Sequence, residues 1–451
     1  MNHLIRIISV LLVTVTLQAQ SPDQSQPNIL IILSDDAGYG DFSFQGGTEF
    51  PTPHIDSLAR DGVRFAEGYV TASVCSPSRA GLLTGRYQQR FGHEFNIPPT
   101  YSETNGLPLD EVMLPAVIKT AGYSTYGLGK WHLGYAPHFH PNSRGFSDWY
   151  GFLQGARSYR SMKGNRLNRL LNNRKPVKEE FEYMTDELGR KAAEYIRGSK
   201  RPFFMYLSFN AVHTPMHAKD GVLEKVTGLQ GKRRRILSAM TRSMDDAVGV
   251  VLSALKETKK DANTLVFFVN DNGGATSNAS RNGKLKGHKG TPFEGGIRVP
   301  FLARFPGRIP KGSVYKKPVS TMDIFSTAIA VAGANPPDKP LDGVNLMPFV
   351  SKEGLPSAPH KHLFWKQGDN WAVRSGEWKL VYYGGKKKAL KLQAPALYNL
   401  AKDIGETTDC SEAAPERKKA LSSAYKKWSR ELTAPKWGRN RLNKQRGDTP
   451  K

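Results

Sequence analysis

Cysteine is almost absent from this chain, because its 451 residues include only Cys75 and Cys410. Small exported folds held by disulfides need many more, so the stability of this protein must come from a hydrophobic core. An even pair in an exported chain can form one disulfide, and a lone cysteine is most often a small buried apolar residue. Cys75 therefore has three possible roles at this point: disulfide partner, core residue or reactive group.

Long apolar runs are also lacking. The apolar stretch near the N-terminus covers residues 7–17, which is too short for a membrane span of about 20 residues. It follows a weakly basic start and ends at Gln18-Ala19-Gln20, a layout typical of a secretory signal peptide over residues 1–20. No cysteine stands at the cleavage point, so we expect no lipid anchor. The prediction is an exported protein, periplasmic or secreted, without a membrane span.

Acidic residues are in deficit, with 40 Asp and Glu against 65 Lys and Arg and a formal net charge of +25. A positive field of this size attracts polyanions. The chain has no recognisable nucleic-acid module, so we expect no nucleic-acid partner and favour a sulfated or otherwise acidic polysaccharide. The alternative is that the charge serves only solubility.

Four continuous apolar runs predict strands that are buried on both faces, as in a parallel sheet. Segments with the apolar period of a helix lie between them, and this alternation is typical of an α/β fold. After removal of a signal peptide about 430 residues remain, more than one core usually holds, so two domains are expected. The predicted strands cover residues 28–33, 124–128, 202–209 and 264–269, and the helices 53–61, 114–121, 184–197 and 233–256.

The pattern changes near Pro336-Pro337. A β-hairpin is predicted over residues 371–383, turning at Ser375-Gly376, and a basic amphipathic helix over 415–432. Residues 157–178 are rich in Arg and Asn and are expected to form an exposed insertion. We therefore predict a catalytic α/β domain over 21–345, a small C-terminal α+β domain with an antiparallel sheet over 346–435, and a basic tail over 436–451.

Each predicted strand is followed by side chains capable of chemistry. In α/β folds ligands bind beyond the carboxyl ends of the strands, so these side chains should converge. Asp35-Asp36 alone, or Asp271-Asn272 alone, would be typical of a turn. Together the two pairs offer the oxygen ligands of a hard cation such as Ca²⁺. In chain order the groups are Asp35-Asp36, Lys130-Trp131-His132, His213 and Asp271-Asn272.

Several segments resemble the type I sulfatases. The run Cys75-Ser-Pro-Ser-Arg79-Ala-Gly-Leu-Leu-Thr-Gly-Arg86 is similar to the signature of that family. So are Gly129-Lys130-Trp131-His132-Leu-Gly134, His213-Thr-Pro215 and Lys289-Gly-Thr-Pro-Phe-Glu294-Gly-Gly-Ile-Arg298-Val-Pro300. The likeness extends loosely to residues 397–406, where Ile404-Gly405 replaces the expected Pro-x pair. The chain thus resembles an arylsulfatase-like, formylglycine-dependent sulfatase.

The resemblance implies an alkaline-phosphatase-like fold and oxidation of Cys75 to formylglycine, by a formylglycine-generating or an anaerobic sulfatase-maturating enzyme. It implies one Ca²⁺ ion held by Asp35, Asp36, Asp271, Asn272 and an oxygen of the modified Cys75. Arg79 would hold the aldehyde hydrate, Lys130 would contact sulfate, and His132 would act on the formylglycine hydroxyl. His213 and Lys289 would bind the sulfate, and either of them could be the proton donor.

We therefore expect a sulfuric ester hydrolase acting on a sulfated carbohydrate, either an algal polysaccharide or a glycosaminoglycan. Two alternatives stay open: a phosphomonoester or phosphonate hydrolase of the same superfamily, and a non-catalytic polyanion-binding protein. Asn278-Ala-Ser280 fits a glycosylation acceptor, but its closeness to the candidate site argues against that use. Candidates for the sugar subsites, or merely surface residues, are Arg157, Arg160, His138, His140, His217 and His288.

Overall fold

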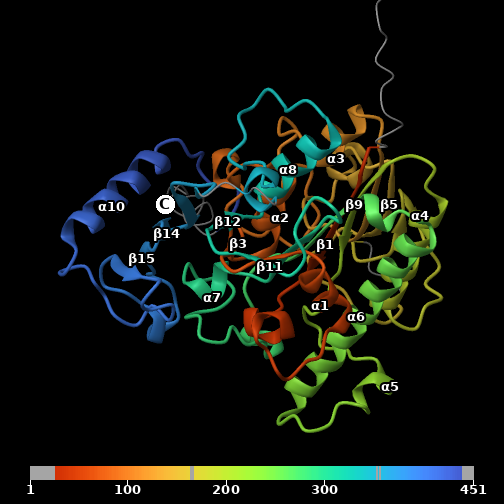
Figure 1. The fold of residues 1–451 in the computed structure, drawn as a ribbon, viewed down its shortest axis with the longest axis horizontal. Coiled ribbons are helices and arrows are strands. Elements are labelled where there is room, and N and C mark those ends of the chain that lie inside the picture. Colours follow the sequence, from red (N-terminus) through yellow and green to blue (C-terminus); the bar gives the residue numbers. More distant parts are fainter. Residues whose placement is uncertain (1–25, 163–166, 352–353, 355–356, 439–451) are drawn as a thin grey trace, which may run out of the picture.

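A ten-stranded sheet runs through the larger part of the computed structural model, which describes residues 26–162, 167–351, 354 and 357–438 (Figure 1). Its strand order is β11-β2-β10-β9-β1-β8-β4-β5-β6-β7. The strands are β1 (Asn28–Ser34), β2 (Val63–Phe65), β4 (Ser124–Lys130), β5 (Asp148–Phe152), β6 (Leu171–Asn172), β7 (Lys175–Pro176), β8 (Phe203–Ser208), β9 (Thr264–Asn270), β10 (Phe301–Arg304) and β11 (Ser313–Tyr315).

The centre of this sheet is parallel. β1 pairs with β8 and β9, and β4 pairs with β8 and β5, all in parallel register. The four predicted strands are confirmed as β1, β4, β8 and β9, with ends that differ by up to two residues. β5, β10 and the short edge strands were not predicted, because their apolar runs are brief. The predicted α/β fold class is confirmed.

Helices cover both faces of the sheet (Figure 1). Alternate residues of β1 point to opposite sides, so Ile29 and Ile31 join one apolar cluster and Leu30 and Ile32 the other. The first cluster includes residues of α2, α3 and α8, and the second includes residues of α1, α4 and α6. The bounds are α1 (Pro53–Arg60), α2 (Cys75–Thr84), α3 (Leu114–Thr120), α4 (Met184–Gly198), α5 (Asp220–Leu223), α6 (Lys232–Glu257), α7 (Glu294–Ile297), α8 (Asp323–Ala332) and α9 (Met347–Val350).

A smaller part, at the left of Figure 1, contains a four-stranded antiparallel sheet covered by one helix. The expected hairpin turns at Gly376-Glu377, one residue later than predicted, because Ser375 pairs with Trp378. The stacked rings of Trp371 and Tyr425 join the helix to the sheet. The elements are β13 (Leu363–Gln367), β14 (Asn370–Ser375), β15 (Trp378–Tyr382), β16 (Ala396–Asn399) and α10 (Pro415–Ser429), while β3 (Gly68–Tyr69) and β12 (Val319–Ser320) form a separate pair.

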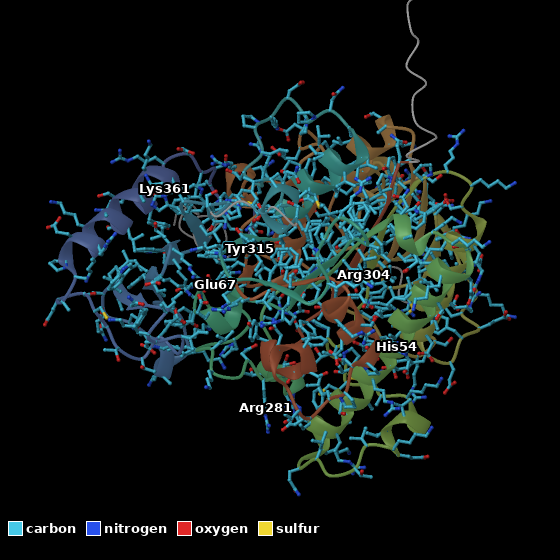
Figure 2. All side chains as sticks on the ribbon, viewed as in Figure 1. His54, Glu67, Arg281, Arg304, Tyr315 and Lys361 are labelled. Atoms are coloured by element: carbon cyan, nitrogen blue, oxygen red, sulfur yellow. The ribbon has the colours of Figure 1, made fainter. Side chains whose placement is uncertain are left out.

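Ionic contacts join the two parts. Arg374 of β14 donates to Glu67 at 2.6 Å, and Glu67 is labelled near this border in Figure 2. Lys379 of β15 lies 2.9 Å from both Glu294 and Glu406, and none of these three side chains is exposed. A buried ammonium between two carboxylates holds the small sheet against α7. The loop that carries Lys289 directly precedes that helix, so this contact helps to place the functional site.

Three further expectations concern a signal peptide, a basic tail and the lack of a membrane span. Residues 1–20, the predicted signal peptide, lie outside the described residues, as do 439–451 of the predicted tail. The start of that tail packs on the larger part, because Lys436 N–H donates to Gly92 C=O at 2.9 Å and Trp437 is buried. Within the described residues, no helix has the length and apolar character needed to cross a membrane.

Candidate active site

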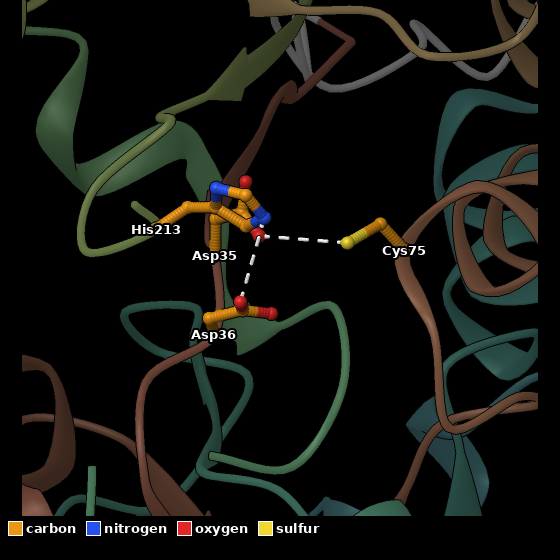
Figure 3. Close-up of side chains that lie close together, drawn as sticks. All are labelled: Asp35, Asp36, Cys75 and His213. Atoms are coloured by element: carbon orange, nitrogen blue, oxygen red, sulfur yellow. Dashed lines mark hydrogen bonds and ion pairs between the residues drawn. The ribbon is translucent and has the colours of Figure 1, made fainter. Parts of the chain in front are cut away.

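The carboxyl end of β1 and the loop that follows β8 both lie next to the first turn of α2. Asp35 and Asp36 directly follow β1, His213 follows β8, and Cys75 begins α2. One potential ligand atom from each of these four residues lies within 4.8 Å of the others. Figure 3 shows their side chains converging on a common point. Two of the four groups expected to converge, Asp35-Asp36 and His213, therefore meet here together with Cys75.

Cys75 is a buried, free thiol. Its Sγ lies 3.0 Å from Lys289 Nζ and 3.7 Å from Asp35 Oδ1. Cys410 is also free, so the possible disulfide between the two cysteines is excluded. Burial raises the pKa of Cys75 to about 12, although Lys130 and Lys289 oppose this shift. Because the thiolate is the reactive form of cysteine, an unmodified Cys75 is a poor nucleophile at neutral pH.

Arg79 lies one helical turn after Cys75 and is completely buried. Its Nε and Nη2 donate to Asp271 Oδ2 at 3.0 and 2.8 Å, and its Nη1 donates to Lys130 C=O at 3.0 Å. This fork links α2 to the ends of β9 and β4, and its bidentate geometry is one that lysine could not reproduce.

Lys130 ends β4 with its ammonium 2.5 Å from Asp35 Oδ2, and both side chains have no exposed surface. Burial alone would raise the pKa of Asp35, but Lys130, His213 and Arg79 together lower it below its ordinary value. Asp35 is therefore ionised at neutral pH. The cation and the carboxylate compensate each other in a site without water contact.

Asp36 adopts a left-handed backbone conformation with φ of 60°. Its Oδ1 accepts from Lys289 Nζ at 2.5 Å and from Asn272 Nδ2 at 2.8 Å. Its carbonyl accepts from Asn278 Nδ2 at 3.1 Å and from Ser280 Oγ at 2.9 Å. These bonds hold a conformation that aspartate tolerates better than most residues do.

Asn278 is buried and uses its amide to hold the loop of Asp36, so its side chain is not available as a glycosylation acceptor. Sequence reasoning also missed Ser208, whose hydroxyl donates to Lys130 C=O at 2.9 Å, and Tyr159, whose hydroxyl donates to His213 C=O at 2.8 Å. No local motif marks Ser208 or Tyr159. Ser208 is the last residue of β8, and that position was the one signal available for it.

The oxygen-rich end of this site fits a hard cation. Asn272 Oδ1 is buried and has no hydrogen-bond partner among the described residues. The same amide group donates through Nδ2 to Asp36 Oδ1 at 2.8 Å. Asp36 N–H in turn donates to Asp271 Oδ1 at 3.3 Å. An orphaned amide oxygen next to three carboxylates matches the ligands that Ca²⁺ prefers. Asp35, Asp36, Asp271 and Asn272 are therefore the residues that would hold the ion.

Two histidines face the same region. His132 has a left-handed φ of 61°, is buried, and its Nδ1 has no hydrogen-bond partner among the described residues. Burial lowers the pKa of His132 well below its ordinary value, with Lys130 and Arg79 adding to the effect. His213 Nδ1 lies 2.6 Å from Thr214 C=O, which can only accept, so Nδ1 carries a proton. Its Nε2 lies 3.5 Å from Asp36 Oδ2.

The candidates for sugar contacts have diverse environments. Arg157 is buried and pairs with Glu179 at 2.7 Å, so the segment expected to be an exposed insertion begins inside the protein. Arg160 is exposed and pairs with Asp220 at 3.0 Å. His140 is buried, and His138, His217 and His288 are half-buried.

Comparison with known proteins identifies relatives of this chain. The family model described as Sulfatase matches residues 27–334. N-acetylgalactosamine-6-sulfatase of Canis lupus familiaris is 36% identical over 383 residues, which cover 79% of this chain and 72% of that protein. The crystal structure of Ps i-CgsB in complex with k-i-k-neocarrahexaose superposes with a TM-score of 0.86 at 34% identity, covering 94% of this chain and 98% of the other.

A phosphonate monoester hydrolase of Agrobacterium radiobacter also superposes, with a TM-score of 0.64 at 21% identity, over 88% of this chain and 94% of that one. This level of identity shows a common fold and nothing about the reaction. The fold predicted from the sequence is thus found both in sulfatases and in a hydrolase of another ester class.

Proposed function

The chain belongs to the sulfatase family, and we propose that this sulfuric ester hydrolase removes sulfate from a sulfated carbohydrate, using formylglycine made from Cys75 and one Ca²⁺ ion. The observation that carries the proposal is the surroundings of Cys75. Its side chain lies against Lys289 and Asp35, at the start of a helix and at one edge of an oxygen-rich cation site.

The chemistry of Cys75 favours modification. A buried neutral thiol is unreactive, whereas formylglycine supplies a hydrated aldehyde whose oxygen can attack sulfur. The conversion is an oxidation, so it needs a maturating enzyme and its oxidant. The Ca²⁺ ion supplies a fixed positive charge that favours an ionised oxygen and an anionic ester.

The remaining residues supply charge and carry protons. Lys289 and His213 are the site residues with partial exposure, 18% for each side chain, so they can meet a sulfate that enters from solvent. Lys130 lies deeper and balances Asp35. Preorganised cations of this kind stabilise the charge that develops on the sulfate oxygens. His213 or Lys289 gives a proton to the departing sugar oxygen, as the family resemblance implies.

His132 has a ring nitrogen that is free to accept a proton. Burial and neighbouring cations lower the pKa of His132, so its imidazole is neutral and keeps one free lone pair. The orphaned Nδ1 shows that this ring has unused hydrogen-bonding capacity. In the proposed reaction it takes a proton from the hydroxyl that remains at residue 75, which releases inorganic sulfate and regenerates the aldehyde. The net reaction consumes one water and yields sulfate, an alcohol and a proton.

The relatives and the charge support the proposed substrate class. One relative is named for N-acetylgalactosamine 6-sulfate, and one solved structure holds a neocarrahexaose. A net charge of +25 suits a polyanionic substrate. We favour an algal polysaccharide or a glycosaminoglycan over a small aryl ester. Export to the periplasm or the medium is part of the same proposal, because such polymers are met outside the cytoplasm.

The test compares wild type, Cys75→Ala and the matched control Cys410→Ala after expression with a maturating enzyme. Peptide mass analysis should find residue 75 converted in wild type and in Cys410→Ala. Released sulfate is measured on desalted carrageenan and chondroitin sulfate oligosaccharides, with a phosphonate monoester as the competing substrate. Activity only when Cys75 is converted supports the proposal. Sulfate release by Cys75→Ala refutes the mechanism, and turnover of the phosphonate alone refutes the substrate class.

A further inference from the structure

Ser76, the residue after the nucleophile position, connects two loops of the active site. Its side chain is completely buried. Its Oγ lies 2.7 Å from the carbonyl oxygen of His132 and 2.7 Å from Nε2 of His93. Its own N–H donates to Asn96 Oδ1 at 2.9 Å. Ser76 is thus the direct polar link between the start of α2 and the loop that carries His132.

The protons in this chain of bonds can be assigned. A carbonyl oxygen only accepts, so the single hydroxyl proton of Ser76 goes to His132 C=O. The Ser76 oxygen must then accept from Nε2–H of His93. This tautomer leaves Nδ1 of His93 as a bare acceptor, and Nδ1 has no hydrogen-bond partner among the described residues. Burial lowers the pKa of His93 to about 3, so the ring stays neutral.

The link matters because His132 has an unusual backbone. Its φ of 61° lies in the left-handed region, which costs free energy for a residue with a side chain. Neighbouring bonds must hold such a conformation. On one side His132 N–H donates to Leu153 C=O at 3.0 Å, and on the other its carbonyl accepts from Ser76. Without the second bond, the His132 carbonyl loses its hydrogen bond to the start of α2, where residue 75 lies.

His93 is held in turn by the C-terminal segment. Its ring meets that of Trp437 edge to face with centroids 4.6 Å apart. Trp437 is buried, and its Nε1 donates to Phe95 C=O at 2.8 Å. Thr433 N–H donates to Gln89 C=O at 3.1 Å in the same loop. Thr433, just before the predicted basic tail, and Trp437, at its start, therefore belong to the outer wall of this network.

We propose that Ser76 and His93 are positioning residues that set the imidazole of His132 against the nucleophile formed at residue 75. The inference rests on the proposed function, because the proton-accepting role of His132 belongs to it. Neither side chain needs to touch the substrate. Their contribution is to the geometry of the chemical step, where a displacement of about 1 Å can cost about 100-fold in rate.

The kinetic test uses Ser76→Ala and His93→Phe, with formylglycine measured by peptide mass analysis because Ser76 lies in the modification motif. We expect kcat per converted site to fall about 10- to 100-fold while KM changes by less than about threefold. Ser76→Thr and His93→Gln retain a hydroxyl and an N–H donor and should recover most of the rate.

The matched control is Thr84→Val, which removes another buried hydroxyl of α2, one that donates to Ala80 C=O at 2.8 Å. Its kcat should equal that of wild type. Unchanged kcat in Ser76→Ala, an equal loss in Thr84→Val, or failure of Ser76→Thr to recover would overturn the inference. If converted wild type released no sulfate from any substrate, the proposed function would fail instead.

A second measurement tests the network without activity. In protein labelled with ¹⁵N-histidine, the signal assigned through His93→Phe should show the Nε2–H tautomer and remain neutral down to about pH 5. In Ser76→Ala the same signal should lose its slowly exchanging ring proton. An Nδ1–H tautomer for His93, or an unchanged signal in Ser76→Ala, would contradict the proposed chain of bonds.

Discussion

Replacing Lys379 with methionine should destabilise the protein strongly and in a pH-dependent way. The ammonium lies 2.9 Å from Glu294 Oε1 and 2.9 Å from Glu406 Oε1, with all three side chains fully buried. Glu294 also accepts from the Tyr69 hydroxyl at 2.6 Å. Methionine keeps much of the volume of lysine and removes the charge, so the change isolates the electrostatic contribution.

The size of the destabilisation depends on the charges that stay buried after Lys379 is replaced. Removing one partner of a buried ion pair costs about 3–5 kcal/mol, because the other charge stays buried without compensation. Here two adjacent carboxylates would be left. Burial raises the pKa of Glu406 to about 7, with Glu294 adding to the rise and Lys379 opposing it. Loss of Lys379 therefore raises that pKa further.

The sign of the pH dependence is set by proton binding. A carboxyl group with a raised folded-state pKa binds more protons folded than unfolded, so its favourable contribution is present at low pH. That contribution is lost as the pH rises from the ordinary glutamate value through the folded pKa, by about 1.4 kcal/mol per pH unit. The deficit of Lys379→Met should thus be largest near pH 8.5 and clearly smaller near pH 5.5.

The assay is urea denaturation of the full chain followed by tryptophan fluorescence at both pH values. The matched control is Lys191→Met on α4, where the ammonium pairs with Glu194 at 2.9 Å on the surface, and it should lose less than about 1 kcal/mol. A deficit below about 1 kcal/mol for Lys379→Met, or the same deficit at pH 5.5 and 8.5, would refute the assignment of a buried charge cluster.

Three further predictions concern the site and its frame. Chelation with EGTA should lower both sulfate release and Tm, with recovery on adding Ca²⁺, and full activity of chelated protein would argue against the cation site. Lys289→Met should lower kcat about 100- to 1,000-fold in steady-state assays. The substitution removes an ammonium that lies 2.5 Å from Asp36 and 3.0 Å from Cys75 Sγ. A loss of kcat below tenfold would contradict the role of Lys289. Asp245→Ala should lower the free energy of unfolding by about 1–2 kcal/mol in urea denaturation without changing sulfate release. Asp245 accepts from Ile55 N–H at 2.8 Å and so caps the start of α1. An unchanged denaturation midpoint would show that this cap is unimportant.

Some strands could be predicted from the sequence and others could not. The long apolar runs of β1, β4, β8 and β9 were predicted well, because a strand buried on both faces is apolar throughout. β5 joins the same parallel sheet but spans only Asp148–Phe152, with Gly151 within it, so its signal was weak. Asn278-Ala-Ser280 matches the pattern of a glycosylation acceptor although Asn278 is buried, because a three-residue pattern contains no information about burial.

The sequence by itself determined the alternation of strands and helices and the identity of the groups that meet at the strand ends. Those properties are read along the chain, from apolar period and motif spacing. The tertiary structure alone decided which polar groups meet. Arg79 pairs with Asp271, 192 residues later, Lys379 pairs with Glu294, 85 residues earlier, and neutral His93 is hydrogen-bonded to Ser76. Pairings of this kind depend on how elements pack in a medium of low dielectric, where one ångström decides whether a buried charge is compensated.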